Sequence, residues 1–144
     1  MVSIQNLTAR SVLADRAQTA TGLFQRMIGL LSRSSLEEGD ALIFPRCNAI
    51  HTYGMRFSID VLFLRTVQGS RFKVQGHNLQ PRTLNLEPIL GTVVRTAERV
   101  RPRRLLSARG ADMVIELPGG SVTRTGTQPG HHMALSYAAS EVDG

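Results

Sequence analysis

The stretch CNAIHTYGMRFSIDVLFLR, residues 47–65, places a thiol, an imidazole, a phenol, a guanidinium and a carboxylate inside one hydrophobic segment. Gly54 predicts a break or a bulge in its middle, because an isolated glycine in a strand pattern marks such features. From Met55 to Phe63, every second residue is apolar. This period of two predicts a β-strand. Its other face begins with Arg56 and Asp60 and ends in leucines, which predicts a strand that runs from a pocket into a core.

Segments on both sides of this stretch have similar strand patterns. Leu23 to Leu31 are different, because apolar residues recur there at the spacing of one helix face, with Thr21 as a candidate N-cap. The sequence therefore predicts a mainly β (α+β) fold, a small antiparallel β-barrel or sandwich with one amphipathic helix packed on it. The other predicted strands and strand-containing segments are Val2–Leu7, Val12–Ala14, Ala41–Phe44, a short piece at Arg71–Val74, 92–104, 111–117 and a closing hairpin over 121–137.

The length of 144 residues predicts one domain, residues 1–144, with a frayed tail at 138–144. The apolar fraction of 42% and the charged fraction of 19% are typical of a globular protein. No apolar run reaches the length of a membrane span, and the first residues do not have the pattern of a secretory signal, so we expect a cytoplasmic protein without a membrane partner. A single cysteine excludes an internal disulfide. No pattern predicts a cofactor.

The net charge of +6 comes almost entirely from arginine, since the chain has 16 arginines and one lysine. One interpretation is codon bias, and the other is a phosphate or nucleic-acid partner, because basic charge attracts polyanions. The sequence has no recognised RNA-binding aromatic motif, zinc-finger spacing or helix-turn-helix pattern. Nucleic acid is therefore the weaker of the partner classes, behind a small molecule or a protein.

Five segments of the chain, taken in order, resemble an uncharacterised bacterial and archaeal protein family, domain-of-unknown-function family 192. The resemblance implies a small, mainly β, barrel-like domain with one helix, and it implies no particular reaction. The matching segments are RMIGLLSRSSL (26–36), ALIF (41–44), NAIHTYGMRFSIDVLFL (48–64), TVVRTAERVRPRR (92–104) and ADMVIELPGG (111–120).

The chain departs from the family pattern in three places. Arg65 stands where similar proteins have an aspartate after the central strand. The chain carries an insertion at about residues 66–90, which we expect to extend a loop over the barrel mouth. The last turn reads Gly130-His131, where similar proteins have Gly-Asp.

Asp60 lies among apolar residues, so we expect it to be buried and either paired or hydrogen-bonded. The favoured interpretation is a structural carboxylate that accepts backbone N–H bonds or pairs with Arg26, Arg56 or Arg82. The alternative is a general base that acts with His51 in a small hydrolase or transferase. The two residues would be roughly 30 Å apart if the chain ran straight between them, so this alternative needs a fold-back at Gly54.

The other candidate reactive groups predict neither a metal site nor a nucleophile. Cys47 and His51 would lie roughly 13 Å apart on one strand face, and their spacing matches no zinc signature. We interpret Cys47 as a small buried side chain. His131 and His132 are adjacent, so on a strand they would point to opposite faces, and we expect them to be exposed.

The arginines between Arg95 and Arg104 are the remaining signal. Arg99, Arg101 and Arg103 alternate, so they would line one face of a strand. The structural interpretation is an edge strand protected by charge. The functional interpretation is an anion site. The sequence favours neither.

We therefore hypothesise a non-enzymatic module that binds a small molecule or a protein. In this hypothesis the central stretch lines a groove, and no residue is catalytic. The predicted polar contacts of the groove are Arg26, His51, Thr52, Arg56 and Asp60.

Overall fold

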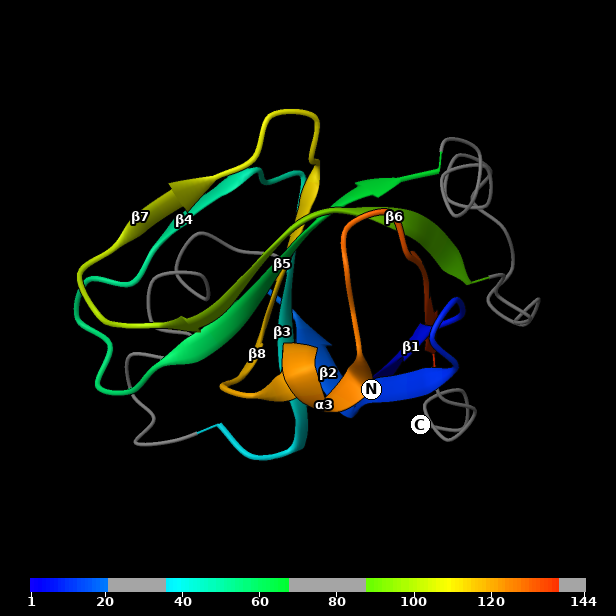
Figure 1. The fold of residues 1–144 in the computed structure, drawn as a ribbon, viewed down its shortest axis with the longest axis horizontal. Helices are drawn as coiled ribbons and strands as arrows, with labels where there is room; N and C mark the ends of the chain where they lie inside the picture. The colour runs from blue at the N-terminus through cyan, green and yellow to red at the C-terminus, as the bar shows by residue number, and fades with distance from the viewer. Residues whose placement is uncertain (21–35, 68–87, 138–144) are drawn as a thin grey trace.

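The computed structural model describes residues 1–20, 36–67 and 88–137. Within them, seven strands close into a barrel in the order β1-β2-β3-β8-β5-β6-β9 (Figure 1). The predicted barrel is thereby confirmed. The barrel strands are β1 (Val2–Asn6), β2 (Ser11–Thr19), β3 (Gly39–Pro45), β5 (Ile59–Thr66), β6 (Ile89–Val100), β8 (Met113–Pro118) and β9 (His132–Tyr137).

Neighbouring strands pair antiparallel around the barrel, except that β2 and β3 are parallel. A parallel pair cannot be joined by a tight turn, because the chain must return to the same end of the sheet. Residues 20–38 make this return, and the predicted helix over Leu23–Leu31 falls in their part that lies outside the described residues. The strand-like piece at Arg71–Val74 and the tail at 138–144 also lie outside them.

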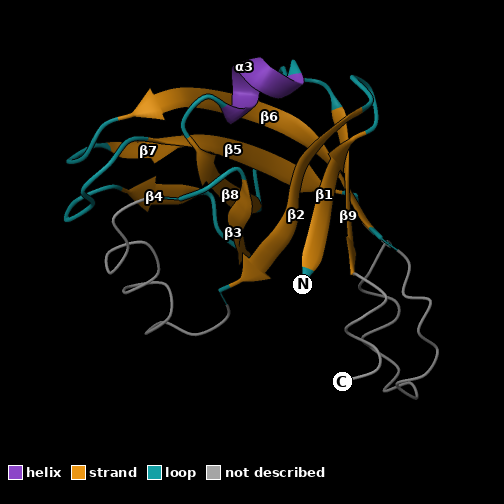
Figure 2. Ribbon diagram, turned by 90° about the horizontal axis from the view of Figure 1, so that it is seen from below, coloured by secondary structure: helices purple, strands orange, loops and turns teal. Residues whose placement is uncertain are grey.

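A two-stranded arm, formed by β4 (Ala49–His51) and β7 (Leu105–Ser107), lies beside the barrel. Figure 2 shows β4 and β7 next to β5. Ile50 of β4 and Leu106 of β7 pack against a second hydrophobic core on the outer side of the barrel wall. The arm therefore closes that core from outside.

Strand β5 is buried on both faces, and it separates the two cores. Leu62 and Leu64 point into the barrel core, whereas Ile59, Val61 and Phe63 belong to the second core. All five are fully buried. The alternation predicted from the sequence is confirmed from Ile59 onward, whereas residues 55–58 precede the strand. The arm supplies the reason why both faces of the strand are apolar.

The segment that follows β8 differs from the prediction. The predicted closing hairpin begins instead with a short helix, α3 (Ser121–Thr125), and only its second half is a strand. Gly120 and Gly126 flank the helix with φ of 97° and 71°. Glycine adopts these left-handed conformations without the steric cost that other residues carry. No helix in the described ranges is long and apolar enough to cross a membrane.

Candidate functional site

The carboxylate of Asp60 is completely buried and accepts three backbone N–H bonds. Oδ1 accepts from Arg99 at 2.8 Å and from Gly120 at 3.1 Å, and Oδ2 accepts from Val122 at 2.7 Å. Charged acceptors make stronger hydrogen bonds than neutral ones. The carboxylate thus joins β5 to the end of β6 and to the start of α3. The prediction of a structural carboxylate bound by backbone N–H groups is confirmed.

Thr52 is also completely buried and plays a similar part at the end of the arm. Its hydroxyl donates to the carbonyl of Arg101 at 2.7 Å and accepts from the N–H of Arg104 at 2.8 Å. Its own N–H donates to the carbonyl of Arg104 at 2.9 Å, and its carbonyl accepts from the N–H of Arg103 at 3.2 Å. Four hydrogen bonds from one residue therefore fix the backbone of 101–104.

Both buried residues hold the same segment, residues 99–104, which we call the arginine loop. It carries Arg99, Arg101, Arg103 and Arg104, all exposed. Arg99 and Arg103 have φ of 48° and 68°, a region that non-glycine residues rarely occupy. Such backbone strain persists only where the surrounding structure determines the conformation. Here Asp60 and Thr52 do so.

The geometry of the arginine loop corrects one prediction. Arg99, Arg101 and Arg103 do not line one face of a strand, because β6 ends at Val100 and the positive φ values break the extended conformation. Within the described residues, none of the arginine-loop side chains forms an ion pair. The loop therefore has a fixed backbone and four exposed arginines that form no ion pair with a described residue.

The guanidinium of Arg99 lies against the turn that precedes α3. A Cβ atom built on Gly120 would lie 3.2 Å from Nη2 of Arg99. The φ of 97° favours glycine there, and a Cβ would also require the Arg99 guanidinium to move by a few tenths of an ångström. Glu98, the acidic neighbour of the loop in the chain, instead accepts a hydrogen bond from Thr123 of α3 at 2.7 Å.

The central stretch also has exposed side chains near Thr52, which binds the arginine loop. His51 and Arg56 are exposed, and Tyr53 is 55% exposed. The His51 and Tyr53 rings are 5.7 Å apart between centroids and tilted by 51°. Leu105, which pairs with His51 across the arm, is 74% exposed. The predicted groove contacts thus divide into exposed His51 and Arg56, and buried Thr52 and Asp60.

Arg95 has a different role from the arginines of the arginine loop. Its Nη1 donates to the carbonyl of Ser107 at 2.6 Å, and its guanidinium lies 5.7 Å from the centre of the Phe63 ring. Arg95 therefore ties β6 to β7 and holds the arm on the barrel. It is a structural member of the predicted Arg95–Arg104 group.

The hydrolase or transferase alternative finds little support in this geometry. The carboxylate of Asp60 is completely buried beneath three backbone N–H donors, so it cannot contact a substrate at the surface. Nδ1 of His51 accepts the N–H of Tyr53 at 3.3 Å, and no hydrogen bond joins the His51 and Asp60 side chains. Arg26 and Arg82, the other candidate partners of Asp60, lie outside the described residues.

The remaining candidates are also placed. Cys47 is half-buried, and its thiol donates to the Ala49 carbonyl at 3.1 Å. His131 is half-buried rather than exposed, because its Nδ1 contacts the Asn6 amide at 3.1 Å. His132 is exposed as expected. In the described part of the chain, no group of three or more His, Cys, Asp or Glu residues could hold a metal ion.

Glu116 is a titratable residue that the sequence interpretation missed. It is only 6% exposed, and it lies on β8 between Leu42 of β3 and Val61 of β5. Burial raises the pKa of its carboxyl group to about 7. Its carboxyl group has no hydrogen-bonding partner among the described residues. The signal in the sequence was a single glutamate inside the apolar run MVIEL.

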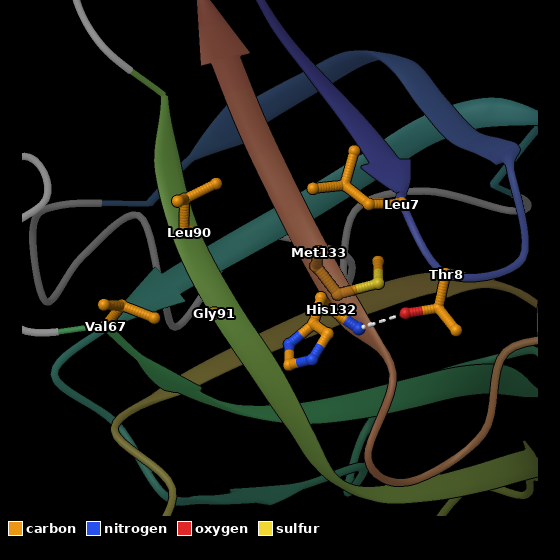
Figure 3. A pocket seen from close by; sticks show the side chains of 7 residues that line it. All are labelled: Leu7, Thr8, Val67, Leu90, Gly91, His132 and Met133. Atoms are coloured by element: carbon orange, nitrogen blue, oxygen red, sulfur yellow. Dashed lines mark hydrogen bonds between the residues drawn. The ribbon is translucent and has the colours of Figure 1, made fainter.

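A cleft of about 350 Å³ opens at the other end of the β5–β6 pair (Figure 3). It lies where β5 ends and β6 begins, and the N–H of Val67 donates there to the carbonyl of Leu90 at 2.7 Å. The only hydrogen bond drawn in Figure 3 joins the backbone of His132 to Thr8. Residues lining the cleft are Leu7, Thr8, Val67, Leu90, Gly91, His132 and Met133.

The fold and the site define a small closed β-barrel with a two-stranded arm, which presents an arginine loop held by two buried polar side chains. The model of the family DUF192, described as uncharacterized ACR, matches residues 5–87. The chain belongs to this family, as its motifs predicted. A comparison with curated proteins gave no match.

Two solved structures share the fold. One is a protein of unknown function from Novosphingobium aromaticivorans DSM 12444, with a TM-score of 0.64 and 20% identity, over 94% of this chain and 83% of that one. The other, from Sinorhizobium meliloti 1021, is named as a candidate transcription regulator. Its TM-score is 0.64 and its identity 20%, over 92% of this chain and 89% of that one. At this identity the likeness shows the fold alone.

Proposed function

We propose that this chain is a non-enzymatic binding module that holds an anionic partner on the arginine loop. The observation that carries the proposal is the pair of buried anchors, Asp60 and Thr52. They fix the backbone of four exposed arginines that form no ion pair within the described residues.

The cost of this arrangement supports a binding function. Two arginines have positive φ, and each such residue costs on the order of 1 kcal/mol. Like charges held close together add repulsion. A charged loop that only kept the protein in solution would need neither the strained backbone nor the buried anchors. Guanidiniums in a fixed arrangement are suited to carboxylate or phosphate groups, which they bind through paired N–H donors.

His51 and Arg56 are exposed and His51 pairs with Leu105 next to the loop, so the predicted contribution of these two residues is retained in the proposal. Thr52 and Asp60 contribute indirectly, because a completely buried side chain cannot touch a partner on the surface. The groove role predicted for them is replaced by a positioning role.

Retention on immobilised heparin, a sulfated polyanion, tests the proposal. The triple variant Arg101→Gln, Arg103→Gln, Arg104→Gln should elute at markedly lower salt than the unmodified chain. A matched control exchanges three exposed arginines elsewhere, Arg10, Arg46 and Arg109, of which Arg10 and Arg46 also have positive φ. Both variants lose the same net charge, so equal elution of the two would refute a site at the arginine loop.

A further inference from the structure

An exposed aromatic pair stands next to the arginine loop. Tyr53 is 55% exposed, although large aromatic side chains are usually buried. Its ring lies 5.7 Å from that of His51, measured between centroids. Both residues flank Thr52 in the chain, the residue that binds the loop backbone through four hydrogen bonds. The backbone that carries the rings therefore lies against the backbone of the arginine loop, where β4 pairs with β7 (Figure 1).

The acidic residues nearest the arginine loop in the chain and in the fold bind groups other than its guanidiniums. Glu98, the acidic residue adjacent to the loop, is bound to Thr123. The carboxylate of Asp60 is buried beneath backbone N–H groups. No acidic side chain among the described residues therefore forms an ion pair with the arginine loop, and its four arginines are exposed.

We propose that the anionic partner is a single-stranded nucleic acid, with its phosphates on the arginine loop and a base stacked on the face of Tyr53. This inference rests on the proposed function. Proteins that bind single strands combine a basic track with aromatic side chains on which unpaired bases stack. An acidic peptide would use the charges and leave the ring without a role. A duplex would offer its phosphates, but its bases are already stacked within the helix.

Fluorescence anisotropy with the full chain and a labelled oligouridine of about 12 nucleotides tests this inference, since binding sites of this kind cover about 4 to 16 nucleotides. Tyr53→Leu should weaken binding about 5- to 150-fold, the loss that follows removal of one stacked base. Tyr53→Phe keeps the ring face and should bind like the unmodified chain. Tyr53 is exposed and makes no side-chain hydrogen bond in the described residues, so both variants should fold, which circular dichroism checks.

The salt dependence gives a second, independent readout. For single strands, each phosphate contact contributes about 0.7 to the slope of log K against log salt. The triple variant Arg101→Gln, Arg103→Gln, Arg104→Gln should therefore lower that slope by about 2. The control variant at Arg10, Arg46 and Arg109 should leave the slope close to its original value.

Poly-glutamate and a duplex of the same sequence length serve as competing probes. Preference for oligouridine over both, lost in Tyr53→Leu and kept in Tyr53→Phe, would support the inference. Equal binding of poly-glutamate or duplex, unchanged in Tyr53→Leu, would overturn it and leave the proposed anionic surface intact. If none of the three probes binds, both the inference and the proposed function are refuted.

Discussion

Replacement of the buried Glu116 by glutamine should change how the stability of the protein depends on pH. The carboxyl group is 6% exposed, and desolvation raises its pKa from 4.5 to about 7. Between these two values the folded protein holds a proton on Glu116 that the unfolded chain has released. The stability that the protonated Glu116 provides is therefore fully present below pH 4.5, the pKa in the unfolded chain. It is lost as the pH rises through the pKa of about 7 in the folded protein.

The size of this effect follows from the shift. One pKa unit corresponds to about 1.4 kcal/mol, so the shift from 4.5 to about 7 corresponds to about 3 kcal/mol in total. Most of it, about 2 to 3 kcal/mol, falls between about pH 5 and about pH 8. Small domains are stable by only about 5 to 15 kcal/mol, so the change is large enough to measure.

Urea unfolding at about pH 5 and about pH 8 measures the effect in the unmodified chain and in Glu116→Gln. The glutamine side chain is neutral and nearly the same shape, so the variant should lose much less stability between the two pH values. At the higher pH, the free energy of unfolding of Glu116→Gln should exceed that of the unmodified chain. Glu37→Gln, at an exposed glutamate, is the control and should keep the original pH dependence. Parallel pH profiles for the unmodified chain and Glu116→Gln would refute the reasoning.

Three further substitutions test the anchors of the arginine loop, each by urea unfolding. Asp60→Asn places an amide where backbone N–H donors converge, and it should lower the free energy of unfolding by about 2 to 4 kcal/mol. Each buried donor left without an acceptor costs about 1 to 3 kcal/mol. An unchanged urea midpoint would contradict the assigned role. Thr52→Val should cost about 1 to 3 kcal/mol and speed amide hydrogen exchange at Arg104, whereas Thr52→Ser keeps the hydroxyl and should remain close to the original stability. Gly120→Ala should cost about 1 to 2 kcal/mol because of its left-handed φ and the nearby Arg99 guanidinium, while Gly119→Ala, where a Cβ meets only ordinary contacts, should cost less.

Patterns of neighbouring residues were enough to predict the central strand. Every second residue from Met55 to Phe63 is apolar, and the strand that results, β5, separates the two cores as the alternation requires. The turn at Gly54 and the buried carboxylate of Asp60 were predicted on the same local grounds. Each of these depends on steric or solvation preferences that act over a few residues.

The same local reasoning misjudged the arginines. Alternation of Arg99, Arg101 and Arg103 suggested a strand face, but two arginines adopt positive φ because distant residues hold their backbone. Glu116 was missed for a related reason. A single glutamate in an apolar run has the same local pattern whether it faces solvent or a second core, and only the neighbouring strands β3 and β5 determine which.

The sequence alone thus determined the strand-rich class of the fold, the family and the separate pieces of the candidate site. Tertiary structure decided how the pieces combine, since Thr52 and Arg101 are 49 residues apart and Asp60 and Arg99 are 39 apart in the chain. Contacts over such separations depend on the closure of the barrel and the placement of the arm, which no short pattern encodes. That closure brings a buried hydroxyl and a buried carboxylate beneath one loop and fixes the backbone that carries four exposed arginines.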